Sequence, residues 1–347
     1  MTGDQDAPIK RLLFEYDLLP LQIIRYGKLY RIETPGGSFA LKSKSINHTI
    51  VDRLRVAYRL SAKLMIDALC PLPSKYGDLV IEQQNGIGSY LLPWIEETVA
   101  ADDLHSRYAR LFLKTGQMHR QTLDGEEEAQ LVYQAMAERL PDRLGIWETF
   151  VSAAEHHLYP SPFEQLVLEA SGGYLTDLQR AMTFFREALQ PKESDEQVDK
   201  RVLRRAFCHG RLSPLHVLID HEKSYFINFE HSSYGPCVIE AAALFEQACA
   251  VQPADQKEWG EWINAYLSAC PLNDEETAFL FHYLISPRAP TDLLAQYMNA
   301  HDESELWFTK RWMKLQRAQT AMLEAFRDYF NRKQQTNAEQ EQTEQKK

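Results

Sequence analysis

The first part of the chain alternates short runs of β-branched and aromatic residues with turn residues. The runs at 19–25, 29–34 and 38–43 are separated by Tyr26-Gly27 and by Pro35-Gly36-Gly37. Such dipeptides and tripeptides are typical of turns between strands. The pattern predicts a meander of three antiparallel strands.

A helix and a further strand are predicted to follow the meander. Apolar or small residues recur at helical spacing over 49–67, namely Ile50, Leu54, Ala57, Ser61 and Leu64, which predicts an amphipathic helix. The run 90–95 predicts a strand that ends at Pro93, because proline cannot donate a hydrogen bond to a neighbouring strand. We therefore expect residues 1–95 to form a small lobe of antiparallel strands with one helix.

Beyond about residue 103 the pattern is mainly helical. Tyr108, Leu111, Phe112, Thr115 and Met118 recur at spacings of three and four. Further helices are predicted at 146–158, 174–189, 238–250, 259–267, 275–284, 291–298 and 304–330, with breaks at Pro160-Ser161-Pro162 and Ser171-Gly172-Gly173. These segments predict a larger, mainly helical lobe over residues 96–330. The fold class is therefore α+β.

The last residues have a different composition. After Asn331 the chain is rich in Gln, Glu and Lys, and Ala338 is its one apolar residue. A segment of this kind cannot bury enough apolar surface to offset the entropy of ordering. We expect 331–347 to form a disordered tail.

Composition and charge exclude several functional classes. The chain has 347 residues, of which 44% are hydrophobic and 25% charged, as in ordinary soluble globular proteins. Its net charge of -11 argues against a nucleic-acid partner, because affinity for phosphate backbones requires clustered Lys and Arg. There is no apolar run long enough to span a bilayer, and Met1–Lys10 lacks a signal pattern. We expect synthesis in the cytoplasm without a signal peptide, and no membrane partner.

The five cysteines are scattered and odd in number, which predicts neither a disulfide scaffold nor a zinc site. Cys208 precedes His209, a pair that invites a Cys/His nucleophile. Adjacent residues of a strand point to opposite faces, however, so we expect Cys208 to be a buried structural thiol. We predict no metal site.

The segment from His209 to Glu230 has the layout of a phosphotransferase active site. Such sites read His-x-Asp, then an Asn five residues on, then a strand that ends in Asp. Arg211, His216 and Asn228 occupy those three functional places here. Short apolar runs at 217–219 and 225–227 predict a hairpin between them.

These exchanges remove the chemistry that the layout serves. The guanidinium of Arg211 cannot accept a proton, so it cannot act as a base. The His216 nitrogen and the neutral Asn228 carbonyl are poorer magnesium ligands than the oxygens they replace. His209 is expected to be a buried support for the loop and not a catalytic base. Glu230 is the one carboxylate left at this strand end, and a rearranged geometry in which it binds metal stays open.

Two residues of the small lobe are candidates for contact with a nucleotide. Phe39-Ala40-Leu41-Lys42 is similar to the third strand of a kinase small lobe, with Lys42 in the place of the lysine that reaches the phosphates. The alternative for Lys42 is a solvated edge residue. Trp94 lies where it could cover an adenine, and the alternative is packing between the lobes.

Residues 209–240 include the segment Ser232–Glu240 with its Tyr234-Gly235-Pro236 turn. They resemble the kinase-like spore coat proteins of Bacillus-type bacteria, the CotS and YutH group. That group is related to aminoglycoside phosphotransferases and choline kinases. The resemblance implies a protein-kinase-like fold of two lobes. It also implies that Glu240, an acid at the start of a helix, braces the loop of the site. The departures at Arg211, His216 and Asn228 resemble the YutH branch.

The resemblance and the missing ligands together predict a pseudokinase of the spore coat. It would act as a structural or assembly protein with other coat proteins as partners, and we expect no cofactor. Two alternatives stay open. One is an ATP-dependent small-molecule phosphotransferase in which Glu230 holds Mg²⁺. The other is a module that binds nucleotide or anion without metal, using the charge of Arg211. Nothing in the sequence indicates the oligomeric state.

Overall fold

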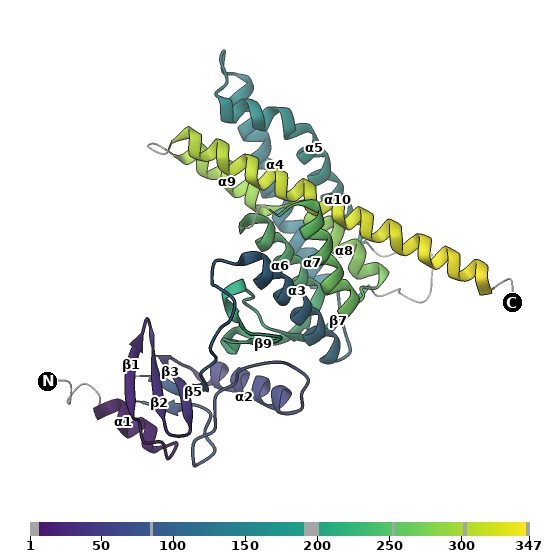
Figure 1. Ribbon diagram of the computed structural model, residues 1–347. Coiled ribbons are helices and arrows are strands. Elements are labelled where there is room, and N and C mark those ends of the chain that lie inside the picture. Colours follow the sequence, from purple (N-terminus) through teal and green to yellow (C-terminus); the bar gives the residue numbers. More distant parts are fainter. Residues whose placement is uncertain (1–6, 84–85, 191–200, 252–253, 301–303, 345–347) are drawn as a thin grey trace. The chain divides into compact units, whose positions relative to one another are not determined.

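The computed structural model describes residues 7–83, 86–190, 201–251, 254–300 and 304–344 and divides into two compact units (Figure 1). The first unit comprises Met1–Thr122 and Phe207–Tyr234, and the second comprises Leu123–Ala206 and Gly235–Lys347. This grouping by spatial contact differs from the lobes expected from the sequence. Their boundary between residues 95 and 96 stays a prediction.

A five-stranded antiparallel sheet is the main element of the first unit. Its strands are β1 (Gln22–Tyr26), β2 (Leu29–Thr34), β3 (Gly37–Ser45), β4 (Ile81–Glu82) and β5 (Ile87–Pro93), in the order β1-β2-β3-β5-β4. The predicted meander and the predicted strand near Pro93 are confirmed. The expected small lobe of antiparallel strands is therefore present.

The two faces of this sheet have different roles. Leu41 on β3 lies opposite Leu91 on β5, and both are buried with Leu12 and Leu13 of helix α1 (Ala7–Phe14). Because side chains alternate along a strand, their neighbours Lys42 and Tyr90 point to the opposite face. The sequence pattern did not predict α1, a short helix whose apolar residues complete this core.

Two further helices belong to the first unit. Helix α2 (His48–Ala62) begins where the Asn47 side chain accepts a hydrogen bond from the Ile50 amide at 3.0 Å. It ends before the predicted residue 67, because Leu64 adopts a left-handed backbone with φ of 57° and is exposed. Helix α3 (Leu104–Gln121) buries all five residues of its predicted stripe.

The predicted hairpin is present as β8 (Val217–Asp220) and β9 (Lys223–Phe226), which pair antiparallel. Single-turn helices η2 (Pro214–His216) and η3 (Phe229–His231) flank it. The guanidinium of Arg107 on α3 donates to the carbonyls of Pro214 at 3.2 Å and Val217 at 3.0 Å. A buried cation of α3 thus holds the loop that leads into the hairpin.

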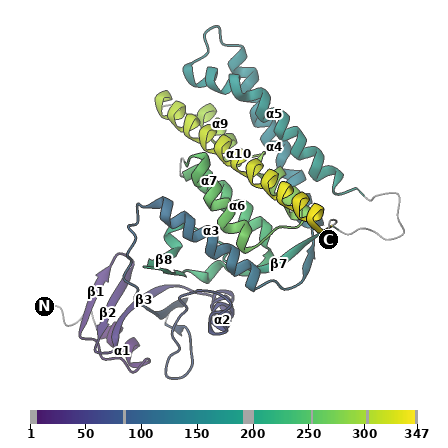
Figure 2. The ribbon, with the colours of Figure 1, turned by 45° about the vertical axis from the view of Figure 1, so that its right-hand side comes forward.

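The second unit is mainly helical. It contains β6 (Glu126–Glu128), which pairs antiparallel with the first part of β7 (Val202–Cys208), and helices α4 (Gln130–Glu155), α5 (Pro162–Glu187), α6 (Cys237–Val251), α7 (Gln256–Ala269), α8 (Asp274–Leu284), α9 (Arg288–Asn299) and α10 (Glu305–Glu344). The short strand β10 (Ser233–Pro236) crosses from the first unit to the second. Helices α4 and α5 pack side by side (Figure 2). Trp147 of α4 stacks on Tyr174 of α5 with ring centroids 4.6 Å apart.

Three boundaries in this unit differ from the expectation. Helix α4 begins at Gln130, well before residue 146. Helix α5 continues through Ser171-Gly172-Gly173, because the stripe that includes Phe163, Val167 and Leu178 is buried on both sides of the glycines. Helix α10 continues past Phe330 to Glu344 where a disordered tail was expected, and residues 345–347 lie outside the described residues. Gln, Glu and Lys have high helix propensities, which do not depend on a core.

Among the described helices, none is both long enough and apolar enough to span a lipid bilayer.

Replacement of Gly172 or Gly173 by alanine tests the continuity of α5. A Cβ at either position meets no atom within 4 Å, so each change should raise the free energy of unfolding by up to about 1 kcal/mol. Gly210→Ala is the contrasting variant. The backbone φ at Gly210 is 78°, and an added Cβ would lie 2.1 Å from the His231 carbonyl oxygen. This variant should therefore lower the free energy of unfolding by about 2 kcal/mol. Denaturant unfolding measures all three, and a loss of stability at Gly172 or Gly173 would contradict a continuous helix.

Candidate functional site

A lysine of the sheet is paired with the loop that follows the hairpin. Lys42 Nζ donates to Asn228 Oδ1 at 2.6 Å and to Glu230 Oε1 at 2.7 Å. These residues are far apart in sequence, and all of them belong to the first unit. The site therefore brings together three of the residues predicted from the sequence, and Lys42 is not a solvated edge residue.

The Glu230 carboxylate is surrounded by donors. Tyr90 Oη donates to Glu230 Oε1 at 2.6 Å, and Lys44 Nζ lies 3.3 Å from the same oxygen. Arg53 of α2 donates to the main-chain carbonyl of Glu230 at 3.1 Å. The Glu230 side chain is 2% exposed. Two ammonium groups and a hydroxyl thus converge on one buried carboxylate oxygen.

The pKa of Glu230 reflects this environment. Burial alone would raise it, but the charge and hydrogen bond of Lys42, with the hydrogen bond of Tyr90, outweigh burial and lower the pKa to about 2. Burial raises the pKa of Tyr90, and the neighbouring Glu230 charge raises it further. Glu230 is therefore ionised and Tyr90 is a neutral donor at physiological pH.

The backbone at Asn228 directs Glu230 into this position. Asn228 has φ of 70° and ψ of 50°, a left-handed conformation that asparagine tolerates better than most residues. It turns the chain from β9 into η3, whose residues Phe229 and Glu230 are buried. Asn228 therefore supports the turn without adding a charge.

His209 holds the loop from within. It is buried, and its Nε2 donates to the Ile227 carbonyl at 2.7 Å while its Nδ1 accepts from the Arg211 amide at 3.3 Å. An imidazole with one donor and one acceptor nitrogen is neutral. Both nitrogens contact main-chain atoms of the loop.

His216 and Arg211 lie at the margin of the site. His216 Nδ1 donates to the Arg211 carbonyl at 2.7 Å. Burial lowers the pKa of His216, and the charges of Arg211 and Lys42 lower it further. The hydrogen bond to the Arg211 carbonyl raises this pKa but does not outweigh the other effects. His216 is thus neutral near pH 7. Among the described residues, no hydrogen bond or ion pair engages the exposed Arg211 guanidinium.

Trp94 does not contact the Lys42 group. Its ring meets Tyr26 edge to face with centroids 5.3 Å apart, and the Arg31 guanidinium lies 4.8 Å above it. Trp94 thus packs against residues of its own sheet, from β1 and β2. Contact between Trp94 and a nucleotide stays a prediction.

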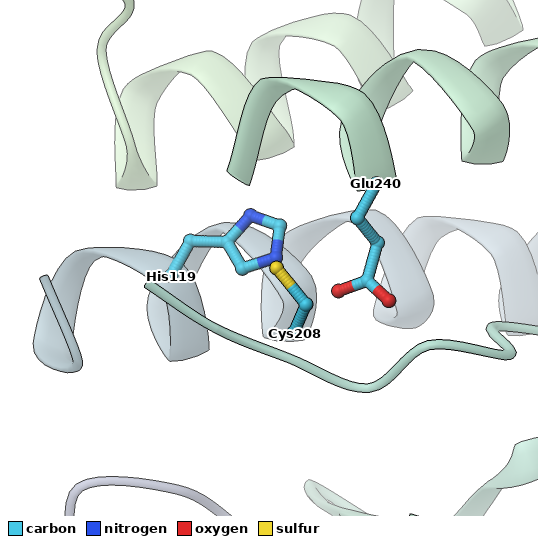
Figure 3. Close-up of side chains that lie close together, drawn as sticks. All are labelled: His119, Cys208 and Glu240. Atoms are coloured by element: carbon cyan, nitrogen blue, oxygen red, sulfur yellow. The ribbon is translucent and has the colours of Figure 1, made fainter. Parts of the chain in front are cut away.

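Figure 3 shows Cys208 and Glu240, the remaining residues singled out from the sequence, together with His119. His119 on α3 and Cys208 at the end of β7 are both buried in the first unit, with a ring nitrogen and the sulfur within 4.8 Å of each other. Cys208 is therefore a buried thiol directed at His119. Glu240 lies in the first turn of α6, in the second unit, and its bracing role stays a prediction, as does the absence of a bound metal.

Four residues of the site were not predicted from the sequence: Lys44, Arg53, Tyr90 and Arg107. Two of them, Lys44 and Tyr90, can be inferred from the strand pattern once Lys42 is identified as a site residue. Lys44 lies two positions further along the same strand and so on the same face. Tyr90 is the cross-strand partner of Lys42, which requires the register of β3 and β5. Arg53 and Arg107 depend on tertiary packing.

Comparisons with solved structures establish the fold. No protein-family model matches the chain, and no curated protein matches it. Among solved structures, it is similar to an aminoglycoside phosphotransferase from Alicyclobacillus acidocaldarius, with a TM-score of 0.69, 17% identity and coverage of 92% of this chain and 95% of that one. It is also similar to an AMP-bound spectinomycin phosphotransferase, with a TM-score of 0.52, 13% identity and coverage of 92% and 98%. The chain has the kinase-like α+β fold of these phosphotransferases.

The pH dependence of stability tests the state of Glu230. Its pKa falls from 4.5 to about 2 on folding, so the ionised group stabilises the protein above pH 4.5 and loses this contribution as the pH drops toward 2. The contribution at neutral pH is about 3 kcal/mol. Glu230→Gln should be less stable at pH 7, and the gap to the unmodified protein should close below pH 4.5. Unfolding profiles that stay parallel down to pH 2 would contradict the ion pair.

Proposed function

We propose that this protein is a pseudokinase, a protein with a phosphotransferase fold and no phosphotransfer activity. It acts by association, as a structural or assembly protein of the bacterial spore coat. The observation that carries the proposal is the ion pair of Lys42 with Glu230. The lysine that would neutralise nucleotide phosphates neutralises instead the Glu230 carboxylate.

The loss of catalysis follows from the donor set. Phosphoryl transfer needs a carboxylate to orient the acceptor hydroxyl and oxygen ligands for Mg²⁺. Arg211 offers donors alone, and Asn228 Oδ1 already accepts from Lys42. A magnesium ion that approached Glu230 would be repelled by Lys42, Lys44 and Arg53. The base and the ion are lost together.

The cellular role rests on the sequence. The resemblance of residues 209–240 to kinase-like spore coat proteins supports a place in the coat, with other coat proteins as partners. A protein of this fold that does not turn over ATP still has large folded surfaces to which other coat proteins can bind. ATP and Mg²⁺ are not required for that role.

A second candidate function is small-molecule phosphotransfer with an unusual metal arrangement. It is favoured by one observation, the ionised Glu230 beside Lys42. Binding of Mg²⁺-ATP would then have to draw Lys42 and Lys44 from the carboxylate to the phosphates.

An assay of ATP turnover separates the two candidates. With saturating Mg²⁺ and ATP, the protein should release no more phosphate than its Lys42→Ala variant, because neither has a base or a held ion. Lys223→Gln, an exposed change on β9, is the matched control for surface charge. Turnover that depends on both Lys42 and Glu230 would support the phosphotransferase and end the pseudokinase account.

The place of action is tested in cells. A fluorescent fusion of the full chain should concentrate at the surface of the developing spore during sporulation. The Glu230→Gln fusion should do the same if association does not depend on the site. Fluorescence that stays diffuse throughout sporulation would contradict a coat role.

A further inference from the structure

The face of the sheet that carries Lys42 is arranged in cross-strand rows. Leu29, Lys42 and Tyr90 are opposite one another on β2, β3 and β5. The next row, two residues along each strand, is Arg31, Ala40 and Leu92. Rows on one face are about 7 Å apart. Arg31 therefore lies one row from Lys42, on the same face.

The second row is filled by side chains of the protein. The Arg31 guanidinium lies 4.8 Å over the Trp94 ring, and Tyr26 meets that ring edge to face. Arg31 is also paired with Glu33 at 3.3 Å and with Glu96 at 2.8 Å. A planar base that entered beside Lys42 would have to displace this arginine from the aromatic ring and from two carboxylates.

The first row and its surroundings carry an excess of positive charge. Lys42, Lys44, Arg53 and Arg211 contribute four cations. Lys42 and Lys44 contact the Glu230 carboxylate, and Arg53 contacts the main-chain carbonyl of Glu230. Each ammonium has three donors, and Glu230 with Asn228 uses few of them. The Arg211 guanidinium has no hydrogen-bond or ion-pair partner among the described residues. These donors favour a compact anion.

We propose that the first unit binds a phosphate-bearing ligand that has no purine base, and that it does so without a metal ion. Lys44 and Arg211 contact the phosphate oxygens, and the Arg31–Trp94 stack excludes a base. Arginine is suited to this role because its planar donors match phosphate oxygens. This inference rests on the proposed function, because it requires that no catalytic metal ion binds beside Glu230.

Titration calorimetry in EDTA tests the proposal with inorganic tripolyphosphate, ATP and adenosine as probes. Tripolyphosphate should bind, adenosine should not, and ATP should bind no more tightly than tripolyphosphate. Lys44→Gln and Arg211→Gln should each weaken the affinity for tripolyphosphate about tenfold, as expected for loss of a charged hydrogen bond. The exposed Lys223→Gln should leave the affinity unchanged.

A second variant tests the exclusion of the base. Arg31→Ala removes the guanidinium from Trp94, and it should leave tripolyphosphate affinity within about twofold while ATP becomes at least tenfold tighter than tripolyphosphate. If this variant binds ATP with the same affinity as tripolyphosphate, the Arg31–Trp94 stack does not exclude a purine base.

Three results for the unmodified protein would overturn the proposal: no binding of tripolyphosphate in EDTA, binding of adenosine, or ATP more than tenfold tighter than tripolyphosphate. Failure of tripolyphosphate binding without ATP turnover removes this inference and leaves the pseudokinase proposal intact. Turnover of Mg²⁺-ATP removes the pseudokinase proposal whatever the calorimetry gives.

Discussion

The ion pair between Lys42 and Glu230 is the interaction on which the site depends. It joins strand β3 to the turn after β9 across a long stretch of sequence, with the ammonium and carboxylate 2.7 Å apart. A buried carboxylate without a cation would be strongly destabilising. The donors of Lys42, Lys44 and Tyr90 remove that cost. They also satisfy the group that would otherwise attract a divalent ion.

Under the proposed function, the contacts that stabilise Glu230 also oppose the binding of a metal ion. In a phosphotransferase, carboxylates are kept available for magnesium, and the lysine is kept for the nucleotide. Here the two groups meet each other, while Arg53 and Arg211 add further positive charge. The loop keeps its shape through His209, Arg107 and the left-handed turn at Asn228.

Much of the fold could be predicted from the sequence, because it follows from local patterns. The strands of the meander, the hairpin and the stripe of α3 all have clear periodicity. The errors have physical causes. Helix α5 passes through Gly172-Gly173 because flanking apolar residues are buried, and α10 extends past Phe330 because helix propensity does not require a core. Helix α1 is too short to produce a distinct pattern.

The candidate site was only partly predictable. Spacing along the chain identified Lys42, Arg211, His216, Asn228 and Glu230 as one group, because each has a place in a known layout. It could not show that Lys42 and Glu230 neutralise each other, since that requires the register of β3 with β5 and the turn after β9. The same limit applies to Arg53 and to the Arg31 contact with Trp94.

The most direct test of the Lys42–Glu230 account is titration with Mn²⁺, an oxygen-seeking substitute for Mg²⁺, followed by electron paramagnetic resonance in the presence of ATP. The account predicts the same free Mn²⁺ signal for the unmodified protein and for Glu230→Gln. Stoichiometric Mn²⁺ binding that Glu230→Gln abolishes would contradict it.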